Sequence, residues 1–309
     1  MNIIYLQRDK IDANKWDKCV ESNLETANLS AMSWYLDICC KDWGALIIDD
    51  YRSVIPLPYR KKHGIEYVYP PFFAHKLGFL GDELTQAETE KAIDWIAKNY
   101  KWADLIFTSN IYYKRGKTIL HQASLLDLRP DYETILKKYH SINRENSQRA
   151  KKENLKLVFD IEPKKIIELF KNNRGKDASV GYQDSDYDNL ANVITLLQER
   201  KAVEVVGVFN ADGVLCAGAF FTISAKRYHL SFSARNVEIK SKCLYFLIDN
   251  FISRHAGENM FLDFIGSNNP NIAKFYAGFG SKEYTFTQLT INNLNILQQF
   301  ALSIYRKLR

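Results

Sequence analysis

The chain has 309 residues, of which 46% are hydrophobic and 25% charged, and its net charge is +6. This length suits two domains better than one, because a single core stops growing at about 250 to 300 residues. The composition holds no low-complexity or Pro/Gly-rich tract, which excludes a disordered or fibrous protein. No apolar run approaches the roughly 18 residues that span a bilayer, and the apolar stretch at the N-terminus is too short for a signal-peptide core.

The first half of the chain alternates between strand and helix patterns. A capping-box spacing, Thr85 to Glu88, starts one helix, and Ser30 is placed to cap another. The predicted elements are a strand at 2–6, helices at 14–21 and 30–40, an antiparallel meander at 45–49, 53–59 and 65–69, a helix at 86–100, and strands at 103–108 and 118–126.

The second half begins with a long polar helix, predicted from residue 131 to about 154. It is followed by a strand at 155–160, helices at 163–172 and 187–200, strands at 203–209, 214–223 and 227–234, a helix at 240–254, a strand at 260–265, a helix at 270–278, a strand at 283–292 and a helix at 294–308. Asp212-Gly213 marks a hairpin between two of these strands.

Both halves therefore share one coarse order of strands and helices. This repetition predicts two tandem α/β domains with mixed central sheets flanked by helices, at residues 1–130 and 131–309. The segment 137–165 carries nine Lys/Arg against four Asp/Glu. Such a run is either a solvated helix face or a patch for an anionic partner such as tRNA.

Two stretches near the C-terminus carry a family resemblance. Phe261-Leu-Asp-Phe-Ile-Gly-Ser267 and Phe275-Tyr-Ala-Gly-Phe-Gly280 resemble the closing signature of Fem-type (FemAB-like) peptidoglycan aminoacyltransferases, which themselves resemble tandem GNAT domains. The chain departs at Tyr276, where lysine is usual. The resemblance implies two tandem GNAT-like domains and an acyl- or aminoacyltransferase acting on an amine of a cell-wall precursor or related metabolite.

A second departure concerns the acyl donor. Acetyl-CoA-dependent members of the superfamily hold the donor pyrophosphate on a glycine-rich loop after the fourth strand. The matching stretch here, Ala234 to Cys243, has no glycine, although Arg235, Lys240 and Lys242 could still contact a phosphate. Acetyl-CoA is therefore disfavoured as donor, no tightly bound cofactor is expected, and aminoacyl-tRNA or an acyl carrier protein stays open.

Three residues are candidates for catalysis. His229 lies on the polar side of a strand that alternates apolar and polar residues, either as a base or as an ordinary polar side chain. Asp263 could bind an ammonium group or act as a base, or it could anchor the following Gly266-Ser267 turn. The resemblance places Tyr276 at the general acid of many GNAT enzymes, and the alternative is a core aromatic residue.

The remaining candidates would bind substrate or donor. Ser267 and Asn268 follow the Asp263 strand, Arg144 and Arg149 belong to the basic segment, and His75 follows a proline-aromatic run that would border a groove between the domains.

The five cysteines show no CxxC spacing, and no His/Cys cluster has the spacing of metal ligands. We therefore expect reduced thiols, a cytoplasmic location and no metal. The main alternative to an acyltransferase is a non-catalytic anion- or nucleotide-binding module on a degenerate GNAT scaffold, and a third is a biosynthetic acyltransferase that uses an acyl carrier protein.

Overall fold

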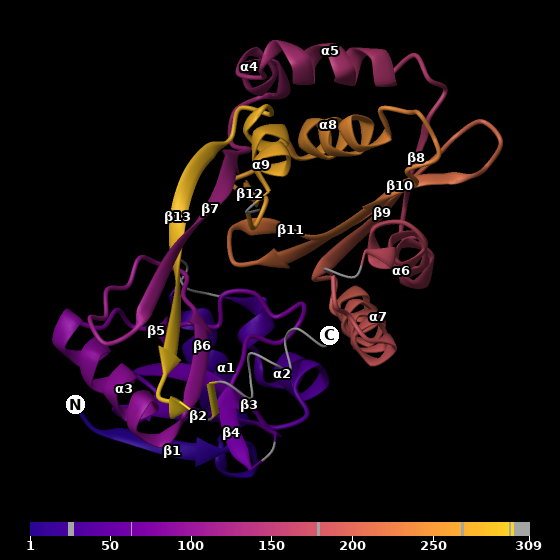
Figure 1. The fold of residues 1–309 in the computed structure, drawn as a ribbon. Coiled ribbons are helices and arrows are strands. Elements are labelled where there is room, and N and C mark those ends of the chain that lie inside the picture. Colours follow the sequence, from indigo (N-terminus) through magenta and orange to yellow (C-terminus); the bar gives the residue numbers. More distant parts are fainter. Residues whose placement is uncertain (24–27, 63, 178–179, 267–268, 297, 300–309) are drawn as a thin grey trace. The chain divides into compact units, whose positions relative to one another are not determined.

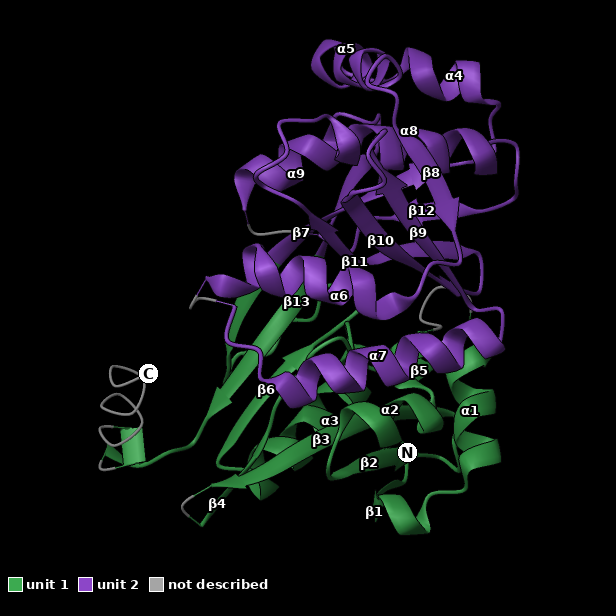
Figure 2. Cartoon of the chain, turned by 90° about the vertical axis from the view of Figure 1, so that its right-hand side faces the viewer, with its two compact units in different colours: residues 1–120, 286–309 green, residues 121–285 purple. Residues whose placement is uncertain are grey.

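The computed structural model describes residues 1–309 except 24–27, 63, 178–179, 267–268, 297 and 300–309. The chain forms two compact units, unit 1 with residues 1–120 and 286–309 and unit 2 with residues 121–285 (Figure 2). Two long strands, β7 (Lys117–Asp127) and β13 (Lys282–Asn292), each run from one unit into the other. These limits differ from the single boundary after residue 130 that the repeated pattern suggested, because the last strand returns to unit 1.

Unit 1 is built on strands in the order β1-β2-β3-β4-β6-β13 (Figure 1). Neighbouring strands are antiparallel, except that β4 and β6 run parallel. The predicted antiparallel meander is therefore confirmed. The strands are β1 (Ile3–Gln7), β2 (Trp43–Ile48), β3 (Ser53–Lys62), β4 (Ile65–Val68), β6 (Trp102–Ile106) and the unforeseen β5 (Leu80–Gly81), which pairs with β3.

The complete α-helices of unit 1 within the described residues are α1 (Ala13–Ser22), α2 (Ser33–Cys39) and α3 (Gln86–Asn99). The capping box at the start of α3 is confirmed, since Thr85 and Glu88 exchange both hydrogen bonds. The prediction that Ser30 caps α2 is wrong. The side-chain oxygen of Asn28 accepts a hydrogen bond from the backbone N–H of Ser30 at 3.0 Å and caps a 3-10 helix (Leu29–Ala31). Helix α2 therefore begins two residues after that 3-10 helix.

Unit 2 has strands in the order β7-β12-β11-β10-β9-β8 (Figure 1). β11 and β12 are parallel, and the other pairs are antiparallel. The hairpin predicted at Asp212-Gly213 joins β9 to β10, with Gly213 at a φ of 76°. The strands are β8 (Lys156–Phe159), β9 (Val203–Phe209), β10 (Leu215–Ser224), β11 (Arg227–Arg235) and β12 (Phe261–Asp263).

The prediction of one long polar helix at 131–154 is wrong, because this segment forms two helices. The helical conformation is interrupted at His140, whose backbone is extended (φ −62°, ψ 150°) and whose N–H donates to Gly278 O at 2.9 Å. This bond ties the break to the end of a distant helix, which the local pattern could not show. The α-helices of unit 2 are α4 (Tyr132–Lys137), α5 (Ser141–Ala150), α6 (Pro163–Asn172), α7 (Asp184–Glu199), α8 (Cys243–His255) and α9 (Pro270–Ala277).

Helices cover the sheet of unit 2 on both faces. A Cβ on Gly218 of β10 would meet Ile166 of α6, so this residue faces α6. Its neighbours Ala217 and Ala219 belong to the core under α8, which places α8 on the opposite face. The Phe221 ring stacks on Phe251 of α8 at 3.6 Å, and burying one such ring contributes roughly 1.5–3 kcal/mol.

The expected α/β class with mixed sheets is confirmed, and each predicted strand is present with ends shifted by a few residues. Most of the helix expected at 294–308 lies outside the described residues.

Candidate functional site

A pocket of about 360 Å³ opens in unit 2 where strand β11 ends and helix α8 begins. This volume lies within the range of small-ligand sites. Arg235, the last residue of β11, and Lys242, the residue before α8, both line it, so the structure brings together two residues predicted to bind the donor. The other lining residues are Ser241, Cys243, Leu244, Tyr245, Asn271, Ile272 and Phe275.

The two walls of this pocket differ in chemistry. The cationic side chains come from β11 and the start of α8, whereas Ile272 and Phe275 come from α9. The Phe275 ring packs edge-on against Tyr245 of α8, with 4.9 Å between the ring centres. A ligand with an anionic group and an apolar or aromatic group would match both walls.

The N-cap amide of α8 is bound by a carboxylate of the chain itself. Glu153, in the turn after α5, accepts the backbone N–H of Lys242 at 3.0 Å and the hydroxyl hydrogen of Ser241 at 2.5 Å. A carboxylate is stabilised there because the N–H groups of the first helical turn have no partner within the helix. Residues 153 and 241 are 88 positions apart, so the sequence carried no local signal for this contact.

Cys243 occupies the first position of α8 but is poorly suited to nucleophilic attack. Its thiol is buried and donates to Cys216 O at 3.5 Å. Burial raises the pKa of the Cys243 thiol, and the neighbouring Cys216 raises it further. The reactive thiolate is therefore disfavoured.

Tyr276 follows Phe275 on α9 and is tied to the strand that ends at Arg235. Its ring stacks on Phe264 at 4.6 Å, and its hydroxyl bonds to Ser233 of β11. Burial raises the pKa of Tyr276 to about 12, although the Ser233 contact lowers it. The phenol therefore keeps its proton at neutral pH and can donate it or a hydrogen bond.

A β-bulge interrupts the alternation expected along β11. The pairing with β10 skips Ser231, since Phe232 faces Phe220 and Leu230 faces Phe221. Leu230 belongs to the core under α8, while the Phe232 ring packs on Phe170 of α6. The single polar face predicted for His229, Ser231, Ser233 and Arg235 is wrong, because one extra residue shifts the side chains beyond it to the other face.

Asp263 lies on the face of the sheet opposite Tyr276. Its neighbours Leu262 and Phe264 belong to the core under α8, so the side chain between them points away from α8. Asp263 is 1% exposed, accepts the Ile265 N–H at 2.7 Å and accepts the Tyr284 hydroxyl at 2.6 Å. The first contact ties Asp263 to the backbone of Ile265, next to the Gly266-Ser267 turn that it was predicted to anchor, and Ser267 lies outside the described residues.

Two basic side chains complete the cluster around Asp263. His229 Nδ1 and Arg227 Nη1 each lie 3.8 Å from Asp263 Oδ2, longer than a hydrogen bond. Of the three predicted catalytic residues, the structure thus places His229 beside Asp263 and Tyr276 on the other face. The sequence analysis did not identify Arg227 and Tyr284 as members of this cluster. The only sequence signal for them was that each lies on a predicted strand beside other polar residues.

The basic residues predicted to contact anions have other partners in the structure. Arg144 donates to three carbonyls at the end of α4, including Lys137 O at 3.0 Å and Tyr139 O at 3.1 Å, so it caps that helix. Arg149 is exposed and lies 3.6 Å from Glu145 one turn earlier on α5.

His75 belongs to unit 1, in the loop between β4 and β5, where Ser30 and Asn28 hold its backbone. Ser267 and Asn268 lie outside the described residues, so their predicted role stays a prediction.

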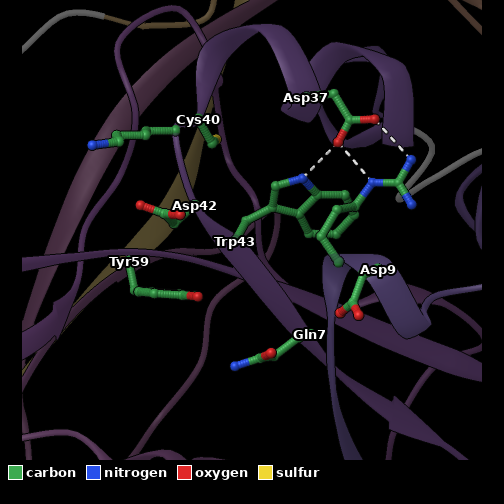
Figure 3. Close-up of a pocket in the computed structure, with 9 residues that line it drawn as sticks. Gln7, Asp9, Asp37, Cys40, Asp42, Trp43 and Tyr59 are labelled. Atoms are coloured by element: carbon green, nitrogen blue, oxygen red, sulfur yellow. Dashed lines mark hydrogen bonds and ion pairs between the residues drawn. The ribbon is translucent and has the colours of Figure 1, made fainter.

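Unit 1 has a hollow of its own, of about 500 Å³ (Figure 3). The guanidinium of Arg8 is held there by both oxygens of Asp37 at 2.6 and 2.7 Å, and the Trp43 indole N–H donates to the same carboxylate at 2.9 Å. Because this cation is already paired, it does not offer an anion site comparable to that beside α8.

Within the part of the chain that the structure describes, no group of three or more His, Cys, Asp and Glu side chains is placed to hold a metal ion. In the same residues no helix has both the length and the apolar character needed to cross a bilayer.

Solved structures of known proteins share this fold. FemX superposes with a TM-score of 0.63 over 98% of this chain and 99% of its own, at 12% identity. The C-terminal domain of a putative lysylphosphatidylglycerol synthetase from Agrobacterium fabrum gives 0.56 at 11% identity, over 94% and 95% of the two chains. L-PGS from Bacillus licheniformis gives 0.55 at 11% identity, over 96% of each chain. The Fem-like fold predicted from the sequence is therefore confirmed. No protein-family model and no curated protein sequence matches the chain.

Proposed function

We propose that the protein is an aminoacyltransferase, or a related acyltransferase, that moves an acyl group onto an amine acceptor. The observation that carries this proposal is the pocket at the start of α8, where Arg235 and Lys242 meet an apolar wall from α9. The fold shared with FemX and lysylphosphatidylglycerol synthetases supports it. The likeness to these proteins also favours an aminoacyl group over other acyl groups as the group transferred, and a cell-wall precursor or a lipid as the acceptor.

The donor that fits best is aminoacyl-tRNA. The phosphodiester before its terminal adenosine would pair with Arg235 and Lys242, and the terminal base and aminoacyl group would lie along the apolar wall. Acetyl-CoA fits less well because the loop after β11 has no glycine, and because Glu153 already takes the Lys242 amide that a pyrophosphate would need. An acyl carrier protein remains a third donor with an anionic phosphopantetheine group.

The chemistry requires two proton transfers. The acceptor nitrogen bonds to the acyl carbon while the ester C–O bond of the donor breaks, so one nitrogen proton must reach the leaving oxygen. A base must also remove one proton from the acceptor ammonium, because only the neutral amine can attack. Tyr276 suits the first transfer because its phenol is protonated at neutral pH. His229 and Asp263 stay predictions for the second transfer, since they lie on the other face of the sheet.

A transfer assay tests the proposal directly. The protein is incubated with tRNA charged with labelled amino acids, or with labelled acetyl-CoA, and with UDP-linked muropeptide as the amine acceptor. We expect transfer from aminoacyl-tRNA that falls at least about tenfold in Arg235→Gln, as for loss of one charge-assisted contact. Lys226→Gln is the matched control, because Lys226 is exposed in the β10–β11 turn and does not line the pocket. Transfer from acetyl-CoA alone would overturn the donor assignment.

One observation favours the non-catalytic alternative, an anion-binding module. The carboxylates of Glu153 and Asp263 are both engaged in internal hydrogen bonds, as in a scaffold that has lost its reaction. Binding of tRNA that weakens with salt, without turnover on any donor and acceptor pair, would identify the module.

A further inference from the structure

Two cationic residues line the pocket at the start of α8, yet the anion bound to the N-cap amide of this helix, the Lys242 N–H, is a side chain of the chain itself. The Lys242 N–H lies 3.0 and 3.3 Å from the two Glu153 carboxylate oxygens, and the Ser241 hydroxyl donates to one of them at 2.5 Å. Ser241 and Lys242 also line the 360 Å³ pocket with Arg235. A helix end beside two cations is an arrangement that ordinarily attracts a phosphate.

The position of Glu153 is fixed by its neighbours. Its own N–H donates to Ala150 O at 3.1 Å, which closes the turn after α5. Two residues earlier, Lys151 Nζ pairs with the buried Asp249 of α8 at 3.1 Å. The segment that carries Glu153 is thus attached to the same helix whose N-cap amide the carboxylate binds.

We infer that Glu153 is a specificity-determining residue that keeps phosphate and pyrophosphate groups off the N-cap amide of α8, the Lys242 N–H. This inference rests on the proposed function and deepens it, because it assigns to one side chain the exclusion of donors that carry a pyrophosphate. A donor phosphate would then contact the pocket only through the side chains of Arg235 and Lys242.

The exclusion follows from occupancy and charge. A phosphate oxygen that reached the Lys242 N–H would have to displace the Glu153 carboxylate, or lie within a few ångströms of a like charge in a half-buried position. Glutamine at position 153 has nearly the same shape and can still accept a hydrogen bond, but it has no charge. Glu153→Gln therefore keeps a hydrogen-bond acceptor for the Lys242 N–H and removes the repulsion between the Glu153 carboxylate and a phosphate.

The test measures binding of inorganic pyrophosphate and of CoA to the full chain by titration calorimetry. The proteins are the wild type, Glu153→Gln and Glu153→Ala, with Glu145→Gln as control, since Glu145 is an exposed carboxylate on neighbouring α5. We expect both Glu153 variants to bind pyrophosphate at least about tenfold more tightly than the wild type and the control. In an ¹⁵N spectrum of Glu153→Gln, the amide resonances of Ser241 and Lys242 should shift on addition of pyrophosphate.

Two outcomes would overturn the inference. One is pyrophosphate binding that is equal in the wild type and the Glu153 variants, and the other is a gain in affinity that persists when Arg235→Gln is added to Glu153→Gln. The readout is separate from that of the proposed function. A wild type that transfers aminoacyl groups, with no gain of binding in the variants, refutes only the exclusion, whereas a gain of binding in a protein without transferase activity refutes only the proposed function.

Discussion

The Tyr284 hydroxyl donates to Asp263 Oδ2 at 2.6 Å, which joins β13 to β12 inside unit 2 through a carboxylate that is 1% exposed. Burial and the adjacent Asp263 charge raise the pKa of Tyr284, so the phenol remains a donor at neutral pH. Tyr284→Phe should lower the free energy of unfolding by about 1.5–3 kcal/mol, because a buried charge loses a hydrogen bond. Urea unfolding measures it, and Tyr112→Phe at a 68% exposed site is the control. Equal losses in both variants would show that the bond contributes nothing.

The turn after Asp263 requires glycine at position 266. Gly266 has a φ of 104°, and a Cβ there would overlap the carbonyl oxygen of Gln122. Gly257 has a similar φ of 89° but nothing within 4 Å of its Cβ position. Gly266→Ala should therefore destabilise the protein by about 1–3 kcal/mol more than Gly257→Ala, since both share the backbone strain and only one has the steric overlap. Thermal unfolding of the two variants measures the difference, and similar melting temperatures would contradict the steric argument.

Asp249 binds α4 and the turn after α5 to α8. This carboxylate is 1% exposed, accepts the Tyr132 hydroxyl at 2.8 Å and the Tyr139 hydroxyl at 3.1 Å, and pairs with Lys151. Asp249→Asn should cost about 2–3 kcal/mol of unfolding free energy, because it leaves the buried hydroxyls and the ammonium group with a weaker acceptor. Glu145→Gln, which breaks only the exposed contact with Arg149, should cost less than about 0.5 kcal/mol. Denaturant unfolding that ranks the two variants in the reverse order would refute this account.

His255 gives the stability of unit 2 a pH dependence. Burial lowers the pKa of this histidine, but Glu204 at 3.1 Å and Glu258 at 3.0 Å outweigh it and raise the pKa above 6.5. Because the folded pKa exceeds the unfolded value, the stabilisation is complete below pH 6.5 and is lost as the pH rises through the folded pKa. Melting temperatures between pH 6 and pH 9 should fall more steeply for the wild type than for His255→Gln. Parallel curves would exclude a charged His255.

Tyr276 is predicted to act as the proton donor in the transfer reaction. Tyr276→Phe should lower kcat/KM by about 10²- to 10⁴-fold, the usual contribution of a general acid, while the ring still stacks on Phe264. Ser233→Ala is the control, since it removes the hydrogen-bond partner of the phenol but leaves its proton. Circular dichroism confirms the fold of both variants. A Tyr276→Phe enzyme with unchanged kcat/KM would assign the residue to the core.

The sequence predicted where the helices and strands lie more accurately than which side chains share a face of a strand. Thr85 and Glu88 carry a complete local signal for a helix start, and the structure contains that capping box. The polar face of β11 was predicted from simple alternation, which cannot anticipate the extra residue at Ser231, because a bulge depends on the register of the partner strand.

Contacts between distant segments account for the other errors. The break at His140 depends on Gly278, and the start of α8 depends on Glu153, so neither could be read from the residues around it. Arg235 and Lys242 were identified because both flank one short loop, and the structure places them in one pocket. The sequence thus predicted two residues of this pocket, while a long-range hydrogen bond from Lys242 to Glu153 decides whether the amide beside it is available.

The return of β13 to unit 1 has a consequence for the order of folding during synthesis. Residues 288–292 pair with residues 102–106, so β6 has no partner on that edge until residues 288–292 have left the ribosome. Unit 2 is continuous from residue 121 to 285 and is complete before that point. The nascent chain therefore holds an unfinished sheet edge while about 180 further residues are added, which at 5–20 residues per second lasts on the order of 10 to 40 seconds. During that interval the open edge of β6 is the place where a chaperone would protect this chain from aggregation.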